Sequence, residues 1–308
     1  MANFLIKNLA RLYLPLYQCD SGTMKIVYAG YSPVKRDYFF RLLPERGIAQ
    51  KFLGRCWYWQ IPDLVKSGRF DLAVSEVSRI SSGHFQNSGG YMMPVWIPMR
   101  INIDRSISEI CKRSESHFSD VLKRIRKYNL TYEMLTDEES FNYFNEKFYL
   151  PYISKRHREE AIINDLKKIW NSSPAPLLMF IKENGIIVAG SLIRRNDDYL
   201  YGVCLGILDG NCDYLRHGVG GAIYYYAILE GQKMGCRYLD VGTTRSFLTD
   251  GLTKYKMSLG AEFVMDKTIL QECMWLGFRD QSDAARNFIR TYPFMYIGRD
   301  NKLVKSPS

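Results

Sequence analysis

The sequence has no uninterrupted apolar run near the roughly 20 residues that a helix needs to span a bilayer. Its seven cysteines are odd in number and scattered, and neither they nor the four histidines form a closely spaced pair. These absences argue against a transmembrane helix, a disulfide framework and a metal site. Neither a Gly-x-Gly-x-x-Gly dinucleotide motif nor a P-loop occurs. We therefore expect a cytoplasmic protein without a metal.

What the chain does have is the composition of a folded protein with an excess of positive charge. Its 308 residues are 46% hydrophobic, 24% charged and 14% aromatic, and its net charge is +10. This length predicts about two domains. The charge suits the phosphates of nucleic acid, of a nucleotide cofactor or of an anionic membrane, or it belongs to a solvated helix face. The densest basic cluster contains Lys112, Arg113, Lys123, Arg124, Arg126 and Lys127.

Residues 1–23 are expected to form an appended amphipathic segment. Apolar residues recur there at roughly helical spacing, which predicts a helix packed on the body of the protein, with an interfacial membrane helix as the alternative. Met24 then opens a strand, and short strands continue up to residue 105. Ser106-x-x-Glu109 has the form of a capping box. It begins an amphipathic helix that carries the basic cluster and ends at Asn129.

The second half of the chain changes from helices to strands. Thr136-x-x-Glu139 resembles another capping box, and the helix after it carries an apolar stripe of Phe141, Phe144 and Phe148. From Leu177 the pattern predicts the order β-β-β-α-β-α-β. The expected elements are strands 177–182, 186–195 and 199–208, a helix at about 218–234, strand 237–241, helix 252–258 and strand 262–271.

A glycine-rich turn lies between the third of these strands and the helix that follows. It reads Arg216-His217-Gly218-Val219-Gly220-Gly221. Glycines let a backbone approach a ligand closely, and the amides at a helix N-terminus attract phosphate. The turn therefore predicts a cradle for a pyrophosphate. The alternative is that the glycines only allow tight packing of strand and helix.

This element order, with a glycine turn at that junction, resembles the GNAT acyltransferase superfamily. The FemAB-like branch, which includes the CelD-like proteins, is more similar still. The shared stretches are Tyr238-Leu239-Asp240-Val241-Gly242, then Arg245, then Tyr255-Lys256-Met257-Ser258-Leu259-Gly260. The segment Phe148-Tyr149-Leu150-Pro151-Tyr152 with Arg156-His157 also matches the linking pattern. The family's turn has Arg or Gln three residues before its first glycine, whereas this chain has Leu215 there and Arg216 one place later.

The resemblance implies an α+β (mixed α/β) fold of the GNAT type. It implies two tandem GNAT-like domains, of which the N-terminal one is degenerate. With the appended segment 1–23, this places the N-terminal domain at 24–128 and the acyltransferase domain at 129–275. Residues 276–308 are then a C-terminal extension.

The resemblance also implies roles for particular residues. Lys256 stabilises the negative charge of the transition state, and Asp240 or His157 takes the proton of the nucleophile. The glycine turn, meaning Arg216, His217, Gly218, Val219, Gly220 and Gly221, holds the pyrophosphate of coenzyme A. The substrate is expected to meet Tyr152, Arg156, Arg245 and Tyr255.

Together these features predict an acyltransferase that moves an acyl group from acyl-CoA, such as acetyl-CoA, to an amine or hydroxyl of a small or polymer-linked acceptor. Such activity would suit cell-envelope or polysaccharide biosynthesis, with peripheral membrane contact left open. One alternative is a FemAB-type transferase that uses aminoacyl-tRNA, although the helical arm common in those enzymes is missing. The other is a basic protein without enzymatic activity that binds nucleic acid or an anionic membrane.

Overall fold

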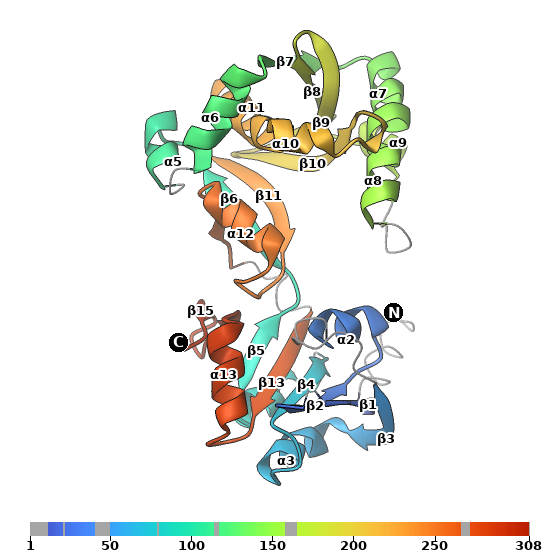
Figure 1. The fold of residues 1–308 in the computed structure, drawn as a ribbon, viewed down its shortest axis with the longest axis vertical. Coiled ribbons are helices and arrows are strands. Elements are labelled where there is room, and N and C mark those ends of the chain that lie inside the picture. The colour runs from blue at the N-terminus through green and yellow to red at the C-terminus, as the bar shows by residue number, and fades with distance from the viewer. Residues whose placement is uncertain are drawn as a thin grey trace. The chain divides into compact units, whose positions relative to one another are not determined.

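A computed structural model describes residues 12–20, 22–40, 50–78, 80–113, 117–157, 165–265 and 272–307 (Figure 1). The chain divides into two compact units. Unit 1 contains Met1–Pro98, Thr243–Lys254 and Phe263–Ser308, and unit 2 contains Met99–Gly242 and Tyr255–Glu262. The chain thus begins in unit 1, builds most of unit 2 in one stretch, and then returns to complete unit 1.

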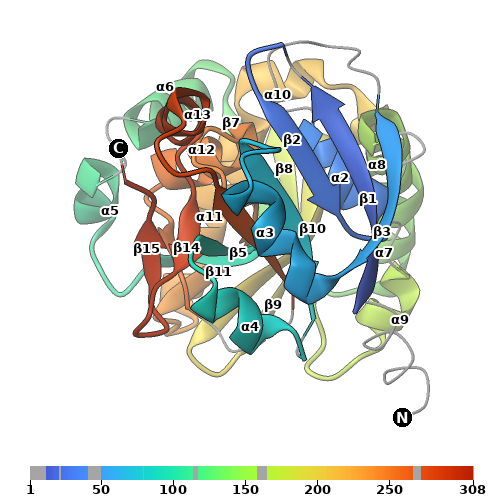
Figure 2. The ribbon, with the colours of Figure 1, turned by 90° about the horizontal axis from the view of Figure 1, so that it is seen from below.

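Unit 1 contains a mixed eight-stranded sheet with the order β15-β14-β5-β13-β4-β2-β1-β3. Its neighbours pair antiparallel, except for the parallel pair β2 and β4. Figure 2 shows β3 at the edge of this sheet, next to β1. The strands are β1 (Tyr13–Asp20), β2 (Lys25–Ala29), β3 (Lys51–Trp57), β4 (Leu72–Val77), β5 (Tyr91–Pro94), β13 (Cys273–Phe278), β14 (Met295–Ile297) and β15 (Leu303–Lys305).

Alternation along these strands places buried side chains on both faces of the sheet. Val27 and Ala29 pack with helices α3 (Ile61–Lys66) and α4 (Ser82–Asn87), whereas Ile26 and Tyr28 pack with α2 (Pro33–Phe40) and α13 (Asp283–Thr291). Because successive side chains of a strand point to opposite faces, helices on both sides require strands that are apolar throughout. All six residues of β4 are buried, and four of them are apolar; the other two are Ser75 and Glu76, both of which are hydrogen-bonded.

Unit 2 is built on a mixed seven-stranded sheet with the order β12-β6-β11-β10-β9-β8-β7. β7, β8, β9 and β10 pair antiparallel in sequence, and β10 pairs parallel with β11. The strands are β6 (Ile97–Asn102), β7 (Leu130–Leu135), β8 (Leu177–Glu183), β9 (Ile186–Asn196), β10 (Tyr199–Ile207), β11 (Tyr238–Thr244) and β12 (Glu262–Phe263). The predicted mixed α/β class is therefore confirmed.

The helices of unit 2 are short, apart from one of 15 residues, α11. α6 and α11 pack together, and an aromatic cluster of Phe141, Phe144 and Phe148 lies against Phe180 of β8. None of the helices in the described residues is long and apolar enough to cross a membrane. The helices are α5 (Ile107–Arg113), α6 (His117–Lys127), α7 (Glu138–Phe144), α8 (Leu150–His157), α9 (Leu166–Trp170), α10 (Asp213–His217), α11 (Val219–Lys233) and α12 (Gly251–Ser258), of which only residues 255–258 belong to unit 2. A π-helical segment, η2 (Asn145–Tyr149), and a 3-10 turn, η4 (Leu208–Gly210), accompany them.

The predicted element order is confirmed from β8 to α12. Two details differ. Helix α10 is inserted between β10 and the glycines of the turn. Of the last predicted strand, 262–271, the described residues 262–265 contain only the short strand β12. Residues 266–271 of that prediction lie outside the described residues. The capping box at Ser106 is confirmed by reciprocal hydrogen bonds with Glu109, whereas α7 is capped by Asp137 rather than Thr136.

The prediction of a helix over the N-terminal segment is wrong for Tyr13–Asp20. These residues form β1, which pairs with both β2 and β3, and Leu14 and Leu16 are buried on one face. Their spacing of two residues is that of a strand. Residues 1–11 of the segment lie outside the described residues.

The units also divide the chain differently from the predicted boundaries at 128 and 275. α6 packs on α11, so residues 99–128 belong to unit 2. The expected extension at 276–308 instead supplies α13, β14 and β15 of unit 1, and residues of β13. The sequence does not predict that the chain returns to its first sheet, because a strand pattern shows that a segment is a strand but not which sheet it joins.

Candidate functional site

The candidate site begins in unit 2 where β10 and β11 cease to pair with each other. The two strands pair parallel over three residue pairs, from Tyr199 with Tyr238 to Tyr201 with Asp240. Beyond these pairs β10 bulges against β9 between Gly202 and Cys204. Asp240 therefore lies at the last position of β11 that pairs with β10, and beyond it the two strands continue without pairing to each other.

The three glycines of the turn have three different surroundings. Gly218 has φ +98°, and a Cβ built on it would lie 2.8 Å from Cβ of Arg124. A Cβ on Gly221 would lie 2.6 Å from Cγ2 of Val121 in α6. Both positions exclude larger residues, so packing accounts for two of the glycines. Gly220 is different, because a Cβ there would meet only ordinary contacts, the first being Tyr255 Oη at 3.5 Å.

The start of α11 presents backbone donors. Gly218 caps α11 without a side-chain hydrogen bond. The first amides of an α-helix have no carbonyl partner within the helix, and the positive end of the helix dipole lies there. An anion at this end would thus receive hydrogen bonds from the main chain beside Gly220.

The neighbouring residues of the turn divide between solvent and core. The Arg216 side chain is 85% exposed and pairs with Asp213 at 3.0 Å. His217 lies 3.0 Å from a carboxylate oxygen of Glu183 and stacks on Tyr128 with ring centroids 4.3 Å apart. The Val219 side chain is fully buried. Only Arg216 among these three has a side chain available to a phosphate, and His217 is held by its neighbours instead.

Arg124 is a residue of this site that the sequence did not predict for it. The basic helix α6 packs on α11 through Val121 and Gly221. This contact brings Arg124 onto the glycine turn, where its Nη1 donates to the carbonyl oxygen of Arg216 at 3.3 Å. One arginine of the basic cluster thus lies beside Arg216 of the glycine turn. A glycine three residues after Gly218 was the only signal of so close a helix contact.

Lys256 is buried in α12, with 4% of its surface exposed. A Cβ built on Gly242 would lie 3.8 Å from Lys256 Nζ, so the ammonium group lies beside the end of β11. Lysine is rarely buried this deeply unless its charge is compensated. The side chain that α12 places next to it, Tyr255, points its hydroxyl toward Gly220.

Asp240 lies on β11 two residues before Gly242. Its Oδ1 accepts a hydrogen bond of 2.6 Å from the amide of Gly242. Burial raises the pKa of the Asp240 carboxyl above its ordinary value, against the lowering effects of that amide and of the Lys256 charge. A carboxylate with a raised pKa binds a proton more readily than an exposed one, which suits a proton acceptor. Asp240, Lys256 and Tyr255 are thus brought together beside the glycine turn.

The remaining predicted residues lie elsewhere. Tyr152 in α8 is 2% exposed, so we expect it to pack rather than to meet an acceptor. Arg156 and His157 end α8, and their side chains lie outside the described residues. Arg245 belongs to unit 1, where its guanidinium lies 4.2 Å from the ring centre of Tyr38 and 3.7 Å from that of Trp96. Within the described part of the chain, no group of three His, Cys, Asp or Glu side chains could hold a metal ion.

No protein-family model and no curated protein matches the chain. Among solved structures, L-PGS from Bacillus licheniformis is similar at 12% identity and a TM-score of 0.44, over 88% of this chain and 82% of that one. FemX is similar at 12% identity and a TM-score of 0.46, over 82% of this chain and 81% of that one. A tandem GNAT protein from the clavulanic acid biosynthesis pathway is similar at 10% identity and a TM-score of 0.33, over 78% of both chains. Since each TM-score is below 0.5, the chemistry is inferred from the residues of this chain.

Proposed function

We propose that the chain is an acyltransferase and that its reaction takes place in unit 2, beside Asp240 and Gly242 of β11. The observation that carries the proposal is the buried Lys256 beside Gly242 and Asp240, at one edge of a turn that offers helix amides. A buried ammonium can stabilise the charge that develops on the carbonyl oxygen in acyl transfer to an amine, and a carboxylate of raised pKa can accept the proton of the amine. The predicted element order from β8 to α12 supports the same assignment.

The donor is held by its phosphates at the glycine turn. The amides at the start of α11 supply hydrogen bonds, and Arg124 and Arg216 supply positive charge. Gly220 keeps this end of the helix clear of a side chain, and the hydroxyl of Tyr255 lies next to it. Acyl-CoA carries a pyrophosphate of the appropriate charge, which makes it our first choice of donor over aminoacyl-tRNA.

In the reaction the amine nitrogen of the acceptor attacks the thioester carbonyl carbon, and a C–N bond forms. Negative charge develops on the carbonyl oxygen, where Lys256 would stabilise it. The C–S bond then breaks and coenzyme A leaves as the thiolate. Asp240 would accept the proton that the amine loses and would pass it to solvent or to the leaving thiolate. For a hydroxyl acceptor the same steps form an ester. The role of His157 as a base stays a prediction.

Calorimetry with the full chain tests the donor class. We expect acetyl-CoA or a longer acyl-CoA to bind, and Gly220→Val to weaken this binding at least tenfold because its side chain would occupy the start of α11. Lys256→Met should bind the donor as the parent does and yet fail to transfer the acyl group. Binding of aminoacyl-tRNA without any binding of thioesters would move the chain to the tRNA-dependent class. If neither donor binds, the chain is not an acyltransferase of this kind.

A further inference from the structure

The β1–β3 edge of unit 1 carries an unusual set of side chains that the proposed reaction does not use. Directly paired residues of two strands point to the same face of a sheet, and three such pairs follow one another here. They are Tyr13 with Trp57, Pro15 with Arg55, and Tyr17 with Phe52. Ring centroids lie 5.0 Å apart in the first pair and 5.5 Å apart in the third. We refer to Tyr13, Tyr17, Phe52, Arg55 and Trp57 as the aromatic–arginine ladder.

A bulge in β3 creates this arrangement. Leu16 pairs with Gly54 and Tyr17 pairs with Phe52, so Leu53 is an extra residue without a partner in β1. Gly54 has φ +105°, a conformation that favours glycine. Leu53 packs toward the core instead. Without the extra residue, Phe52 would point to the opposite face from Arg55 and Trp57. The bulge therefore gathers aromatic rings and a guanidinium on one face.

The rings of the ladder are exposed to an extent that is rare for large apolar side chains. Trp57 is 43% exposed, Phe52 is 55% exposed, and Tyr13 is 41% exposed. Trp59 continues the ladder, stacked on Trp57 with ring centroids 4.8 Å apart and an angle of 9° between the planes. Contiguous exposed apolar surface of this kind marks an interaction site.

Two arginines are set among these rings. The Arg36 guanidinium lies 4.2 Å from the ring centre of Tyr17, and that of Arg55 lies 5.8 Å from the ring centre of Tyr31. The hydroxyl of Tyr31 donates to the carbonyl oxygen of Tyr13 at 2.8 Å. One guanidinium from α2 and one from β3 thus lie over ring faces, and the only acid contacting either guanidinium in the described residues is Asp37.

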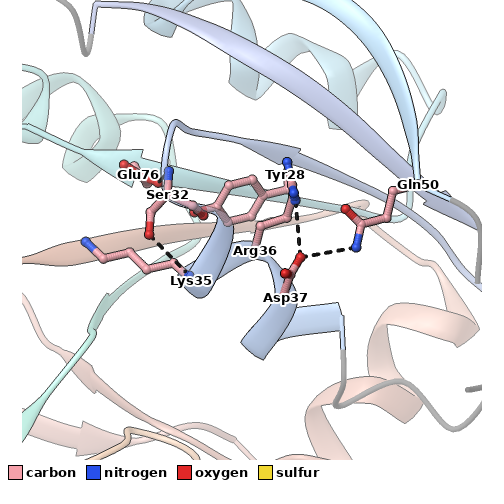
Figure 3. A network of polar contacts seen from close by, with 7 residues as sticks. All are labelled: Tyr28, Ser32, Lys35, Arg36, Asp37, Gln50 and Glu76. Carbon is pink, nitrogen blue, oxygen red and sulfur yellow. Dashed lines mark hydrogen bonds and ion pairs between the residues drawn. The ribbon is translucent and has the colours of Figure 1, made fainter. Parts of the chain in front are cut away.

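Buried hydrogen bonds hold this face in place (Figure 3). Glu76 is 3% exposed, and its Oε1 accepts from the Tyr28 hydroxyl and from the Ser32 amide, each at 2.7 Å. These bonds anchor the loop that carries Tyr31 and the start of α2. Figure 3 shows Asp37 between Arg36 and Gln50, and its Oδ1 accepts from both. Hydrogen bonds thus hold Arg36 and the loop that carries Tyr31 in position beside the ladder.

We propose that the aromatic–arginine ladder binds single-stranded nucleic acid. Exposed rings offer stacking surfaces to bases, which all have an aromatic face, and arginines between them meet the phosphates. Carbohydrate would call for carboxylates and amides that bond its hydroxyls, whereas this face is cationic and its one acid is already bonded. A second copy of the chain, paired along the edge strand β3, would bring together two strands that each carry Lys51 and Arg55 and no acid, so their charges would repel. A polyanion with exposed rings suits the surface best.

Fluorescence anisotropy of a labelled oligothymidylate of about 12 nucleotides tests the proposal on the full chain, within the range of single-strand sites of this kind. We expect binding to the single strand and weaker binding to a duplex of equal length. Trp57→Ala and Phe52→Ala should each weaken it by about 5- to 150-fold. Arg55→Ala should lower the slope of log affinity against log salt by about 0.7. Ile186→Ala and Arg286→Ala, which change exposed residues far from β3 in sequence, should leave binding unchanged.

Two further measurements keep the result decisive. Trp57→Phe and Trp59→Phe conserve a ring, so they should fold, retain binding and lose part of the tryptophan quenching that the oligonucleotide causes in the parent. Vesicles of phosphatidylglycerol are the competing probe. Binding to vesicles that Trp57→Ala abolishes, without binding to the oligonucleotide, would overturn the proposal and assign the face to a membrane. Oligonucleotide binding that no ladder variant alters would overturn it as well.

Discussion

In unit 2 the side chains with chemistry are polar and largely buried, whereas at the β1–β3 edge of unit 1 they are aromatic and exposed. Lys256 is 4% exposed beside Asp240, and Phe52 is 55% exposed beside Tyr17. Burying the lysine and exposing the ring both cost stability, since a buried charge loses its hydration and an exposed ring remains in contact with water. Folding alone accounts for neither. The comparison suggests that the two units have separate functions, one chemical and one in binding.

The largest effect is expected at Asp240. Asp240→Asn keeps the shape of the side chain but removes the proton acceptor, so we expect turnover to fall about 10²- to 10⁴-fold. In the parent, activity should rise with pH as the carboxyl ionises, through a pKa above the ordinary carboxyl range. The pH profile of kcat/KM measures this limb, which Asn should abolish. A parent profile without such a limb would remove Asp240 as the base.

The raised pKa of Asp240 also predicts how the free energy of unfolding changes with pH. Because its pKa is raised in the folded protein, protonated Asp240 favours folding, and this contribution is lost as pH rises from the unfolded value through the folded one. The difference in free energy of unfolding between the Asn variant and the parent should therefore increase across that range. Urea unfolding at several pH values tests the sign, and a constant difference would contradict the assignment of a raised pKa.

Lys256→Met is expected to have the next largest effect. The substitution retains much of the apolar stem and removes the charge, so turnover should fall about 10²- to 10³-fold, as for the loss of an oxyanion donor. Lys254→Met provides the matched control, because Lys254 is exposed on the same helix. Equal turnover in both variants would show that burial of Lys256 serves the fold alone.

A smaller effect distinguishes the glycines of the turn. Gly221→Ala places a Cβ 2.6 Å from Val121, and we expect it to lower the free energy of unfolding by about 1–3 kcal/mol through overpacking of α11 on α6. Gly220→Ala meets no contact closer than 3.5 Å and should cost less than Gly221→Ala. Thermal and urea unfolding compare the two. The reverse order would mean that α6 and α11 pack through other residues.

The smallest effect is expected at the ladder. Trp57→Ala removes an exposed ring, so its cost in unfolding free energy should be about 1 kcal/mol or less, and acyl transfer should remain at the parent rate. Unfolding curves and a transfer assay measure the two quantities. A loss of transfer comparable with that of Lys256→Met would show that the two regions do not act separately.

Much of unit 2 could be predicted from local patterns. The hairpin at Asn184-Gly185, the strands on either side of it and the apolar stripe of Phe141 and Phe144 depend on periodicity and turn chemistry within a few residues. Part of the candidate site was also predicted, because Lys256, Asp240 and the glycines fall in short motifs. Arg124 was not, because it reaches the turn through a helix contact between segments 92 residues apart.

The β1–β3 ladder illustrates the opposite case. The Tyr13–Asp20 segment predicts a helix when its apolar residues are counted alone, and only pairing with two other strands determines that it is β1. The bulge at Leu53 cannot be predicted from the residues around it either. Its effect is to place Phe52 opposite Tyr17 of β1, and this depends on a second strand. The spacing of apolar residues shows which positions are buried, and the same residues can fit a helical or a strand period. Pairing with a neighbouring strand decides which of the two periods the segment adopts.

The sequence by itself determined the element order from β8 to α12 and the residue types at the glycine turn, because these depend on local spacing. The mixed α/β class followed from the resemblance that this order carries. Tertiary structure decided that residues 273–305 complete the first sheet, that Lys256 is buried beside Asp240, and that rings and arginines share one face of β1 and β3. Burial, pKa and a common face are relations between distant segments. They exist only once the chain has folded, and they carry both functions proposed for this protein.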